Sequence, residues 1–347
     1  CGPASIYNAC SLIPVDELRR RGLIPDPDQH LDEYYPVVNR PEVTSELTPL
    51  GPAPIQLEGP SNCGLFLQRY GHVRVEVLQA PYHNDPGFID RDIPEWERDG
   101  TSYYKGGVKV VLPPNESAGS DDWRTAVALV LGPTVIAKIV VGLDENADPV
   151  PVLKTLVEMV VSHLSAPPTR EMALSYSPSD QHGPDACELL SAADVKALLG
   201  GPSDGFARRQ AGLAENRIFL NNGKSTYFTE TVCQRALART GAVSFSVSPN
   251  ARLALRTYHE VAAAETTMRQ ILDPHGSAFG PPVVLPQIGD DLGAVTPAVY
   301  GDRKVVFRVG RYIGELDYRD GTESVESPDV LAHRVTPVAH AIANRLK

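Results

Sequence analysis

Hydrophobic and polar residues alternate strictly at two places in the chain. Residues 73–77 are Val-Arg-Val-Glu-Val, and residues 243–247, 170 positions later, are Val-Ser-Phe-Ser-Val. A period of two predicts a β-strand with one buried side and one solvent-facing side. Because such alternation is typical of antiparallel sheets, we expect an antiparallel sheet in each half of the chain.

Helix signals occur at corresponding places in the two halves. Pro14 begins and Gly22 ends one short amphipathic segment. Ser191 and Asp194 form a capping box before a second segment, which ends at Gly200. Longer amphipathic segments close the two halves, at about 151–164 and about 329–346. Together with the strands, these segments predict an α+β fold with helices packed on antiparallel sheets.

Several short stretches of the first half recur in the second. Residues 8–13 recur at 185–190, an offset of 177, and Cys63 recurs at Cys233, an offset of 170. Two further stretches recur as well, 110–113 at 283–286 and 135–139 at 305–309. Self-similarity of this kind predicts two tandem copies of one small domain.

The repeat also predicts how the chain is divided. We expect a tether at residues 1–7, a first copy at 8–166 with a proline-rich insertion at 24–59, a linker at 167–184, and a second copy at 185–347. The linker assignment follows from its content of Pro, Ser and Gly.

Four of the five cysteines divide evenly between the two copies. They allow three pairings, and the duplication favours Cys10 with Cys63 and Cys187 with Cys233. One disulfide in each copy indicates an oxidising compartment outside the cytoplasm.

The fifth cysteine is Cys1, followed by Gly2, Pro3 and Ala4. This start is typical of a bacterial lipoprotein after removal of its signal peptide, with the lipid on Cys1. No run of apolar residues reaches the roughly 18 that a membrane span needs. We therefore expect an exported protein held at the outer face of the cytoplasmic membrane by membrane lipid on Cys1.

The segment 185–200, Asp-Ala-Cys-Glu-Leu-Leu-Ser-Ala-Ala-Asp-Val-Lys-Ala-Leu-Leu-Gly, has a second cysteine 46 positions after its own. It resembles a family of actinobacterial envelope lipoproteins of unknown function, similar to the extracellular sensor domains of mycobacterial serine/threonine kinases. The resemblance implies an exported fold with a helix tied by a disulfide to a later strand. It supplies no catalytic residues.

Charge and motifs narrow the function. The net charge of −11 excludes nucleic acid as an expected partner, because phosphate binding needs a basic surface. Gly201–Gly205 fits the G-x-S-x-G pattern of serine hydrolases, but a capped helix precedes it where a strand is needed, which predicts a turn. The histidines lack metal-site spacing, and the acidic run 90–99 lacks that of a calcium loop. We expect no enzyme activity, metal or cofactor.

Aromatic residues suggest where a partner would bind. Tyr34 and Tyr35 lie in the proline-rich insertion, and Trp96, Tyr103 and Tyr104 lie beside the acidic run. Tyr and Trp are frequent anchors of interfaces, although they are also ordinary core residues.

The expected function is therefore that of a non-enzymatic accessory or interaction subunit. It would dock onto an integral membrane protein complex of the envelope. The alternative is a ligand-binding or sensing lipoprotein that uses the cleft between the two copies.

Overall fold

The computed structural model describes thirteen stretches of the chain, and all structural statements concern these stretches. They are residues 7–26, 31–41, 56–68, 71–79, 88–113, 123–144, 147–164, 183–216, 226–237, 249–274, 281–296, 304–319 and 327–347. Most of the expected tether 1–7 and of the expected linker 167–184, the alternating residues 243–247, and Cys1 lie outside them.

The chain forms two compact units. The first comprises Cys1–Val37, Ile55–Ser177 and Gly212–Glu215, and the second comprises Val38–Pro54, Pro178–Ala211 and Asn216–Lys347. Each unit therefore includes a short segment from the other half of the sequence.

The first unit holds a mostly antiparallel sheet with the strand order β1-β4-β5-β9-β8-β7-β6. Its strands are β1 (Leu31–Tyr34), β3 (Gln56–Glu58), β4 (Ser61–Leu67), β5 (Gly71–Gln79), β6 (Thr101–Lys105), β7 (Val108–Leu112), β8 (Trp123–Leu131) and β9 (Val135–Asp144). Its helices are the 3-10 helix η1 (Ala9–Leu12), α1 (Val15–Arg20), the π-helical turn η2 (Phe88–Asp92), α2 (Ile93–Asp99) and α3 (Val150–Leu164).

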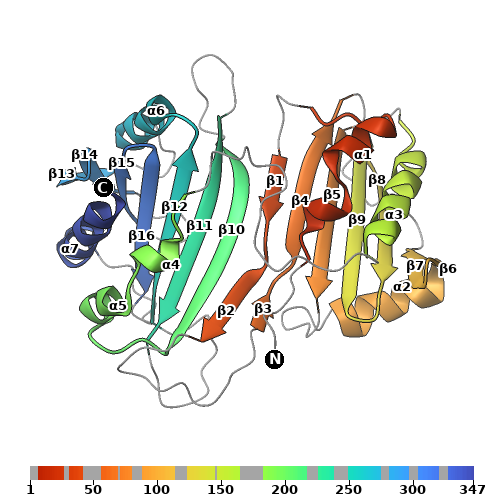
Figure 1. The fold of residues 1–347 in the computed structure, drawn as a ribbon, viewed down its shortest axis with the longest axis horizontal. Helices are drawn as coiled ribbons and strands as arrows, with labels where there is room; N and C mark the ends of the chain where they lie inside the picture. The colour runs from red at the N-terminus through yellow and green to blue at the C-terminus, as the bar shows by residue number, and fades with distance from the viewer. Residues whose placement is uncertain are drawn as a thin grey trace. The chain divides into compact units, whose positions relative to one another are not determined.

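Helices cover both faces of this sheet (Figure 1). One face carries Val73, Val75 and Val77 of β5, which pack with η1, α1 and α3 in the main core. The alternating pattern of residues 73–77 thus predicted β5 correctly. The other face carries Val111, Leu129 and Ile136, which pack with Ile93 and Trp96 of α2.

The second unit has the strand order β13-β14-β15-β16-β12-β11-β10. Its strands are β10 (Phe206–Asn216), β11 (Thr226–Ala236), β12 (Asn250–Tyr258), β13 (Val283–Ile288), β14 (Asp291–Val295), β15 (Val305–Val309) and β16 (Tyr312–Arg319). Val38–Pro41 of β2 (Val37–Pro41) pair with Phe206–Arg209 of β10. Its helices are α4 (Ala186–Leu189), α5 (Ala192–Leu199), α6 (Val261–Leu272) and α7 (Pro328–Leu346).

Here too, helices lie on both faces of the sheet (Figure 1). Val305, Phe307 and Val309 of β15 pack with α4, α5 and α7 in one core. Arg308 points to the opposite face, because side chains alternate along a strand, and its guanidinium lies 3.8 Å from the carboxylate of Glu265 on α6. The expected α+β class with antiparallel sheets and two disulfides is therefore correct.

The two units share a succession of elements that starts at the strand with the second cysteine of a disulfide. That strand, β4 or β11, is followed by another strand, a helical segment, four strands and a closing helix. Two short helices precede it in each half of the chain, but they are followed by β1, β2 and β3 in the first half and by β10 alone in the second. The strand order is also the same, β4-β5-β9-β8-β7-β6 in the first unit and β11-β12-β16-β15-β14-β13 in the second.

Two of the sequence matches link strands that hold different places in the two sheets. Residues 110–113 and 283–286 lie in β7 and β13, although β13 holds the place of β6. Residues 135–139 and 305–309 lie in β9 and β15, although β15 holds the place of β8. Valine-rich strands resemble one another whatever their place in a sheet, so local similarity matched neighbours.

The described residues of the proline-rich segment 24–59 include the strands β1, β2 and β3. Of the described prolines in this segment, Pro25 and Pro36 lie outside the strands and Pro41 ends β2, so none interrupts a strand. Among the described residues, no helix is both long enough and apolar enough to cross a lipid bilayer.

Candidate functional site

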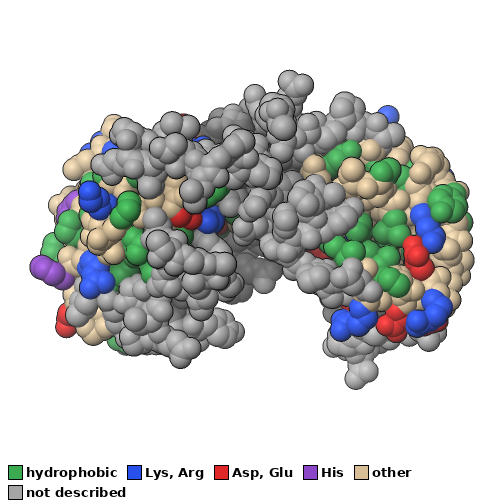
Figure 2. Space-filling view, turned by 90° about the horizontal axis from the view of Figure 1, so that it is seen from below, with side chains coloured by type: hydrophobic (Ala, Val, Ile, Leu, Met, Phe, Trp, Pro, Cys, Tyr) green, Lys and Arg blue, Asp and Glu red, His purple; other side chains and the backbone are tan. Residues whose placement is uncertain are grey.

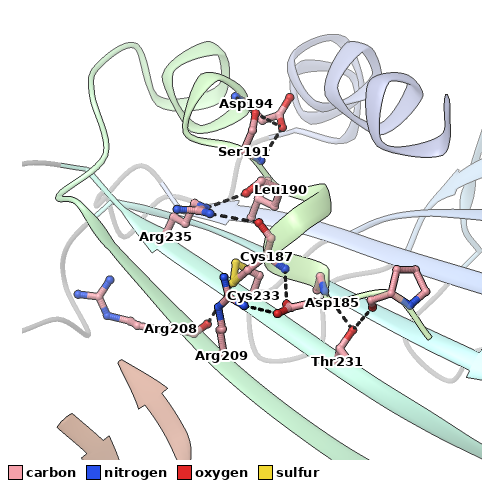
Figure 3. The surroundings of a disulfide bond; sticks show 12 residues. Asp185, Cys187, Leu190, Ser191, Asp194, Arg208, Arg209, Thr231, Cys233 and Arg235 are labelled. Atoms are coloured by element: carbon pink, nitrogen blue, oxygen red, sulfur yellow. Dashed lines mark hydrogen bonds and ion pairs between the residues drawn. A yellow bond between two sulfur atoms is a disulfide. The ribbon is translucent and has the colours of Figure 1, made fainter. Parts of the chain in front are cut away.

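The disulfide of the second unit lies in a dense polar setting (Figure 3). The Asp185 carboxylate caps α4 by accepting a 2.8 Å hydrogen bond from the Cys187 amide. The guanidinium of Arg235 donates to the backbone carbonyls of Leu190, at 2.7 Å, and of Cys187, at 3.2 Å. Cys187 and Cys233 are both buried. The cap of α4 and the contacts of Arg235 on β11 thus hold the backbone around the buried disulfide.

Two contacts around the disulfides are alike in the two units. Asn8 caps η1 through a 2.8 Å hydrogen bond from the Cys10 amide, as Asp185 does for α4. The Ala9 amide donates to the Ser61 hydroxyl at 2.9 Å. In the second unit the Ala186 amide donates to the Thr231 hydroxyl at 3.2 Å. Ser61 and Thr231 each lie two residues before the strand cysteine.

Of the tyrosines and tryptophan expected at a partner surface, one is buried and two are partly covered. Tyr35 is 1% exposed, and its hydroxyl accepts a 3.0 Å hydrogen bond from Asn8. Tyr34 is half-buried, with its ring directly over the glycine at position 212. Trp96 is also half-buried and packs against the α2 side of the first sheet. Tyr35 thus follows the ordinary core alternative, and Trp96 is only partly covered.

Tyr103 and Tyr104 lie on the surface. Tyr103 is 39% exposed and Tyr104 is 78% exposed. Both belong to β6, whose five residues are all exposed and which, within the described residues, pairs only with β7. β6 is therefore an edge strand, and the edge of a sheet presents backbone amide and carbonyl groups to other chains.

The hairpin β6–β7 is held in place from both sides. Lys105 of β6 forms a 2.8 Å ion pair with Glu158 of α3, and Lys109 of β7 forms one of the same length with Glu97 of α2. The turn consists of Gly106 and Gly107, with φ angles of 58° and 82°, as a tight two-residue hairpin needs. The tyrosines are thus presented by a fixed hairpin.

The surface beside α2 is charged. In Figure 2 acidic and basic side chains lie next to one another over the part of the first unit where α2 lies. The ion pairs Arg91–Asp92 and Arg98–Asp99, both 2.7 Å, belong to this surface. Together with the pair Lys109–Glu97, they leave Asp92, Glu97 and Asp99 of the acidic run 90–99 in ion pairs.

Exposed hydrophobic side chains gather on the edge hairpins of the two sheets. Among the described residues, the large hydrophobic side chains with the highest exposure are Ile24, Tyr103, Tyr104, Val261, Val283, Val284 and Leu292. Five of these seven lie on β6 or on the hairpin β13–β14, which ends the second sheet. Pro286 and a register shift between Val284 and Gln287 disrupt the β13 edge, whereas β6 pairs in regular register. β6 is thus the less protected edge.

A largely buried network of ion pairs lies on the face of the second sheet that also carries Arg308. Arg256 lies 2.8 Å from Glu315 and 3.3 Å from Glu230, and Lys304 lies 2.8 Å from Glu315. Burial opposes ionisation of Glu315, but the charges of Arg256 and Lys304 more than offset it, so the pKa of Glu315 lies below its usual value. Since each charge faces an opposite one, the network suits a structural role.

The G-x-S-x-G segment forms a turn, as expected. Ser203 is 2% exposed, and its hydroxyl accepts a 3.3 Å hydrogen bond from the Gly205 amide. The described residues contain no group of three or more His, Cys, Asp or Glu side chains that could hold a metal ion.

One hollow of about 460 Å³ lies within the second unit. Its lining comes from the end of α5, from the residue after β11, from the residue before β12 and from one arginine of α7. These residues are Ala197, Leu198, Leu199, Gly200, Leu237, Pro249 and Arg334.

Comparisons with protein-family models, with curated proteins and with solved structures find no match to this chain.

Proposed function

We propose that the protein is a non-catalytic, extracytoplasmic interaction protein that docks onto a protein partner of the cell envelope through the hairpin β6–β7. One observation carries this proposal. Two exposed tyrosines lie on a regular, open sheet edge that ion pairs hold against α2 and α3. An accessory or assembly subunit of a membrane complex needs such a rigid, exposed contact surface.

An open sheet edge is a liability for a protein that has no use for it, because other chains can pair with it and aggregate. Soluble proteins usually blunt an edge strand with a proline, a bulge or an inward charge, as happens on β13. On β6 the one charged residue, Lys105, is turned to Glu158 of α3, and two tyrosines are exposed beside it. Tyrosine contributes large, rigid contact area at a low entropic cost, so it is enriched among the residues that dominate binding energy.

The two disulfides support the extracytoplasmic setting. Both are formed and all four cysteines are buried. Such bonds form and persist mainly in oxidising compartments. The resemblance of residues 185–200 to envelope lipoproteins points the same way. Lipidation of Cys1 stays a prediction.

We also propose that the two units are copies of one domain. The support is the shared element succession, the shared strand order, and the equivalent caps and hydroxyl contacts around the two disulfides. The hairpin tyrosines have no counterpart in the second unit, where the β13 edge carries Val283, Val284 and Pro286. The proposed function therefore belongs to the first copy.

The test is site-specific photo-crosslinking in cells that produce the protein. A photoreactive residue at position 104 is expected to give a defined crosslinked species, whereas the same residue at Ile24, exposed in the same unit but off the hairpin, is not. Once that species is identified, Tyr104→Ser is expected to weaken binding about tenfold, the scale of one interface anchor. Ile24→Ser serves as the matched control. Equal crosslinking at both positions, or unchanged affinity of Tyr104→Ser, would refute the hairpin as the docking site.

The hollow in the second unit favours one alternative, a ligand-binding protein. Its volume is within the usual range for small-molecule sites, its walls combine apolar and polar surface, and Arg334 supplies one cation. The fluorescent probe 1-anilinonaphthalene-8-sulfonate, an apolar anion, tests it. Saturable binding that is lost in Leu237→Trp would support this function, and binding that this variant leaves unchanged would rule it out.

A further inference from the structure

In both units the same pair of helices is joined by the same kind of contact. The third residue of α1 is Glu17, and its carboxylate lies 2.8 Å from the imidazole Nε2 of His163, the last residue but one of α3. The third residue of α5 is Asp194, and it binds Arg345, the last residue but one of α7. We call these contacts the helix clasps.

The two helix clasps differ in the chemistry of the base. Arg345 donates to both carboxylate oxygens of Asp194, at 2.6 and 3.1 Å, and also to the Leu189 carbonyl. A guanidinium remains charged at any physiological pH. An imidazole is the only side chain whose ordinary charge change falls between pH 5 and 8.

From this geometry we infer that the helix clasp of the first unit is a pH-responsive joint, while the helix clasp of the second unit is its permanent counterpart. Protonated His163 makes a charge-assisted hydrogen bond with Glu17, and the neutral ring keeps at most an uncharged one. α1 is therefore held more firmly to α3 below neutral pH than above it. This inference goes beyond the proposed partner binding and does not depend on it.

The charged groups linked to the contact between Glu17 and His163 come from α1, α3 and β6. α1 contributes Glu17 and Arg21, which lie 2.8 Å apart, and α3 contributes Glu158, 3.5 Å from Arg21. β6 contributes Lys105, 2.8 Å from Glu158.

The carboxylate of Glu17 stays ionised between pH 5.5 and pH 8. The hydrogen bond from His163, followed by that from Arg21, holds the pKa of Glu17 below its usual value. Glu17 is therefore still ionised at pH 5.5, so the contact changes between pH 5.5 and 8 through the base. The side chains of Glu17 and His163 are 17% and 31% exposed, which limits the size of the effect through solvent screening.

Hydrogen exchange of the full, disulfide-bonded chain at pH 5.5 and pH 8.0, corrected for intrinsic rates, measures how firmly α1 is held to α3. We expect the amides of α1 and of the last turn of α3 to be up to about fivefold better protected at pH 5.5. The amides of α5 and of the last turn of α7 are expected to show equal corrected protection at the two pH values.

Exchanging the two bases tests the assignment. His163→Arg is expected to remove the pH dependence from the first unit, and Arg345→His to create one in the second. His333→Gln, which replaces an exposed histidine of α7, should change neither. Equal protection of α1 at both pH values, or a pH dependence that survives His163→Arg, would overturn the inference. If Arg345→His does not fold, His163→Arg and His163→Gln decide the question alone, because both must abolish the response.

Discussion

At the scale of single residues, Asp194 combines two tasks in one side chain. It closes the capping box of α5 through hydrogen bonds from the Ser191 amide and hydroxyl, at 2.7 and 2.6 Å, and it binds Arg345 across the core. Burial opposes its ionisation, but the hydrogen bonds from Arg345 and Ser191 and the charge of Arg345 outweigh it. The pKa of Asp194 therefore lies below its usual value.

This balance predicts how Asp194→Asn behaves. A carboxyl with a lowered pKa contributes stability above its ordinary pKa, and this stability is lost as the pH falls through the native-state value. At pH 7 the variant should therefore lose about 1–2 kcal/mol of unfolding free energy, the scale of a lost cap and charged hydrogen bond. Urea titrations at pH 7 and at pH 3 measure the difference, which should shrink at the lower pH.

Asp329→Asn provides the control for this change. Asp329 is an exposed acid in the first turn of α7, so its replacement should alter the free energy of unfolding by less than about 0.5 kcal/mol at either pH. A loss at Asp194 that is the same at pH 7 and pH 3 would show that the charge of Asp194 is not what stabilises the second unit.

The sequence predicted the contacts of single residues correctly where the contacting residue lies nearby in the chain. The capping box of Ser191 and Asp194 and the stop at Gly200 are as predicted, since both depend on residues a turn apart. The burial of Tyr35 was missed because its partner, Asn8, lies 27 residues away. Arg345 as the partner of Asp194, 151 residues away, leaves no local trace either.

At the scale of elements, the hairpin β6–β7 depends on a close approach at its turn. A Cβ atom on Gly106 would lie 2.8 Å from Cγ1 of Val161 on α3, whereas one on Gly107 would meet nothing within 4 Å. Both glycines have positive φ, which L-residues with a side chain adopt at a cost of roughly 1 kcal/mol.

We therefore expect Gly106→Ala to destabilise the hairpin more than Gly107→Ala. Both variants carry the backbone strain, and only Gly106→Ala also displaces α3. Adding Val161→Ala to Gly106→Ala should restore hydrogen-exchange protection of the β6 amides to the level of Gly107→Ala with Val161→Ala. Equal protection in the two single variants would mean that the hairpin does not rest on α3 at this point.

Element types were easier to predict than element identities. The strand at 73–77 and the closing helices were recognisable from their periods, because each has one wet face. β15 has five buried residues in a row, so it carries no alternation that could distinguish it from its neighbours. The edge strand β6 was not recognised as an edge from the sequence, since the position of a strand in a sheet is set by distant pairing.

At the scale of the whole molecule, each unit has its own disulfide and its own core. The closed loops are 53 and 46 residues long in sequence separation, and each bond is worth roughly 4 kcal/mol on the loop-entropy model. A small core that loses such a contribution is close to unfolding.

Removing one disulfide should therefore weaken one unit first. The pair Cys10→Ser with Cys63→Ser is expected to make the first unit the earlier target of limited proteolysis, and Cys187→Ser with Cys233→Ser the second. Mass spectrometry of the early fragments reads out which unit is cut. Identical fragments from both variants would show that the two units unfold as one.

Each unit contains a segment from the other half of the sequence, and this affects the order in which the chain can fold during synthesis. Gly212 and Leu213 pair with Tyr34 and Glu33 inside the first unit, and Val38–Pro41 pair with Phe206–Arg209 inside the second. A ribosome that has released only the first half of the chain has therefore not yet supplied the strand that flanks β1. The sheet of the first unit therefore gains this pairing only after residue 213 has emerged, so its outer edge at β1 is the last part of that sheet to be completed during synthesis.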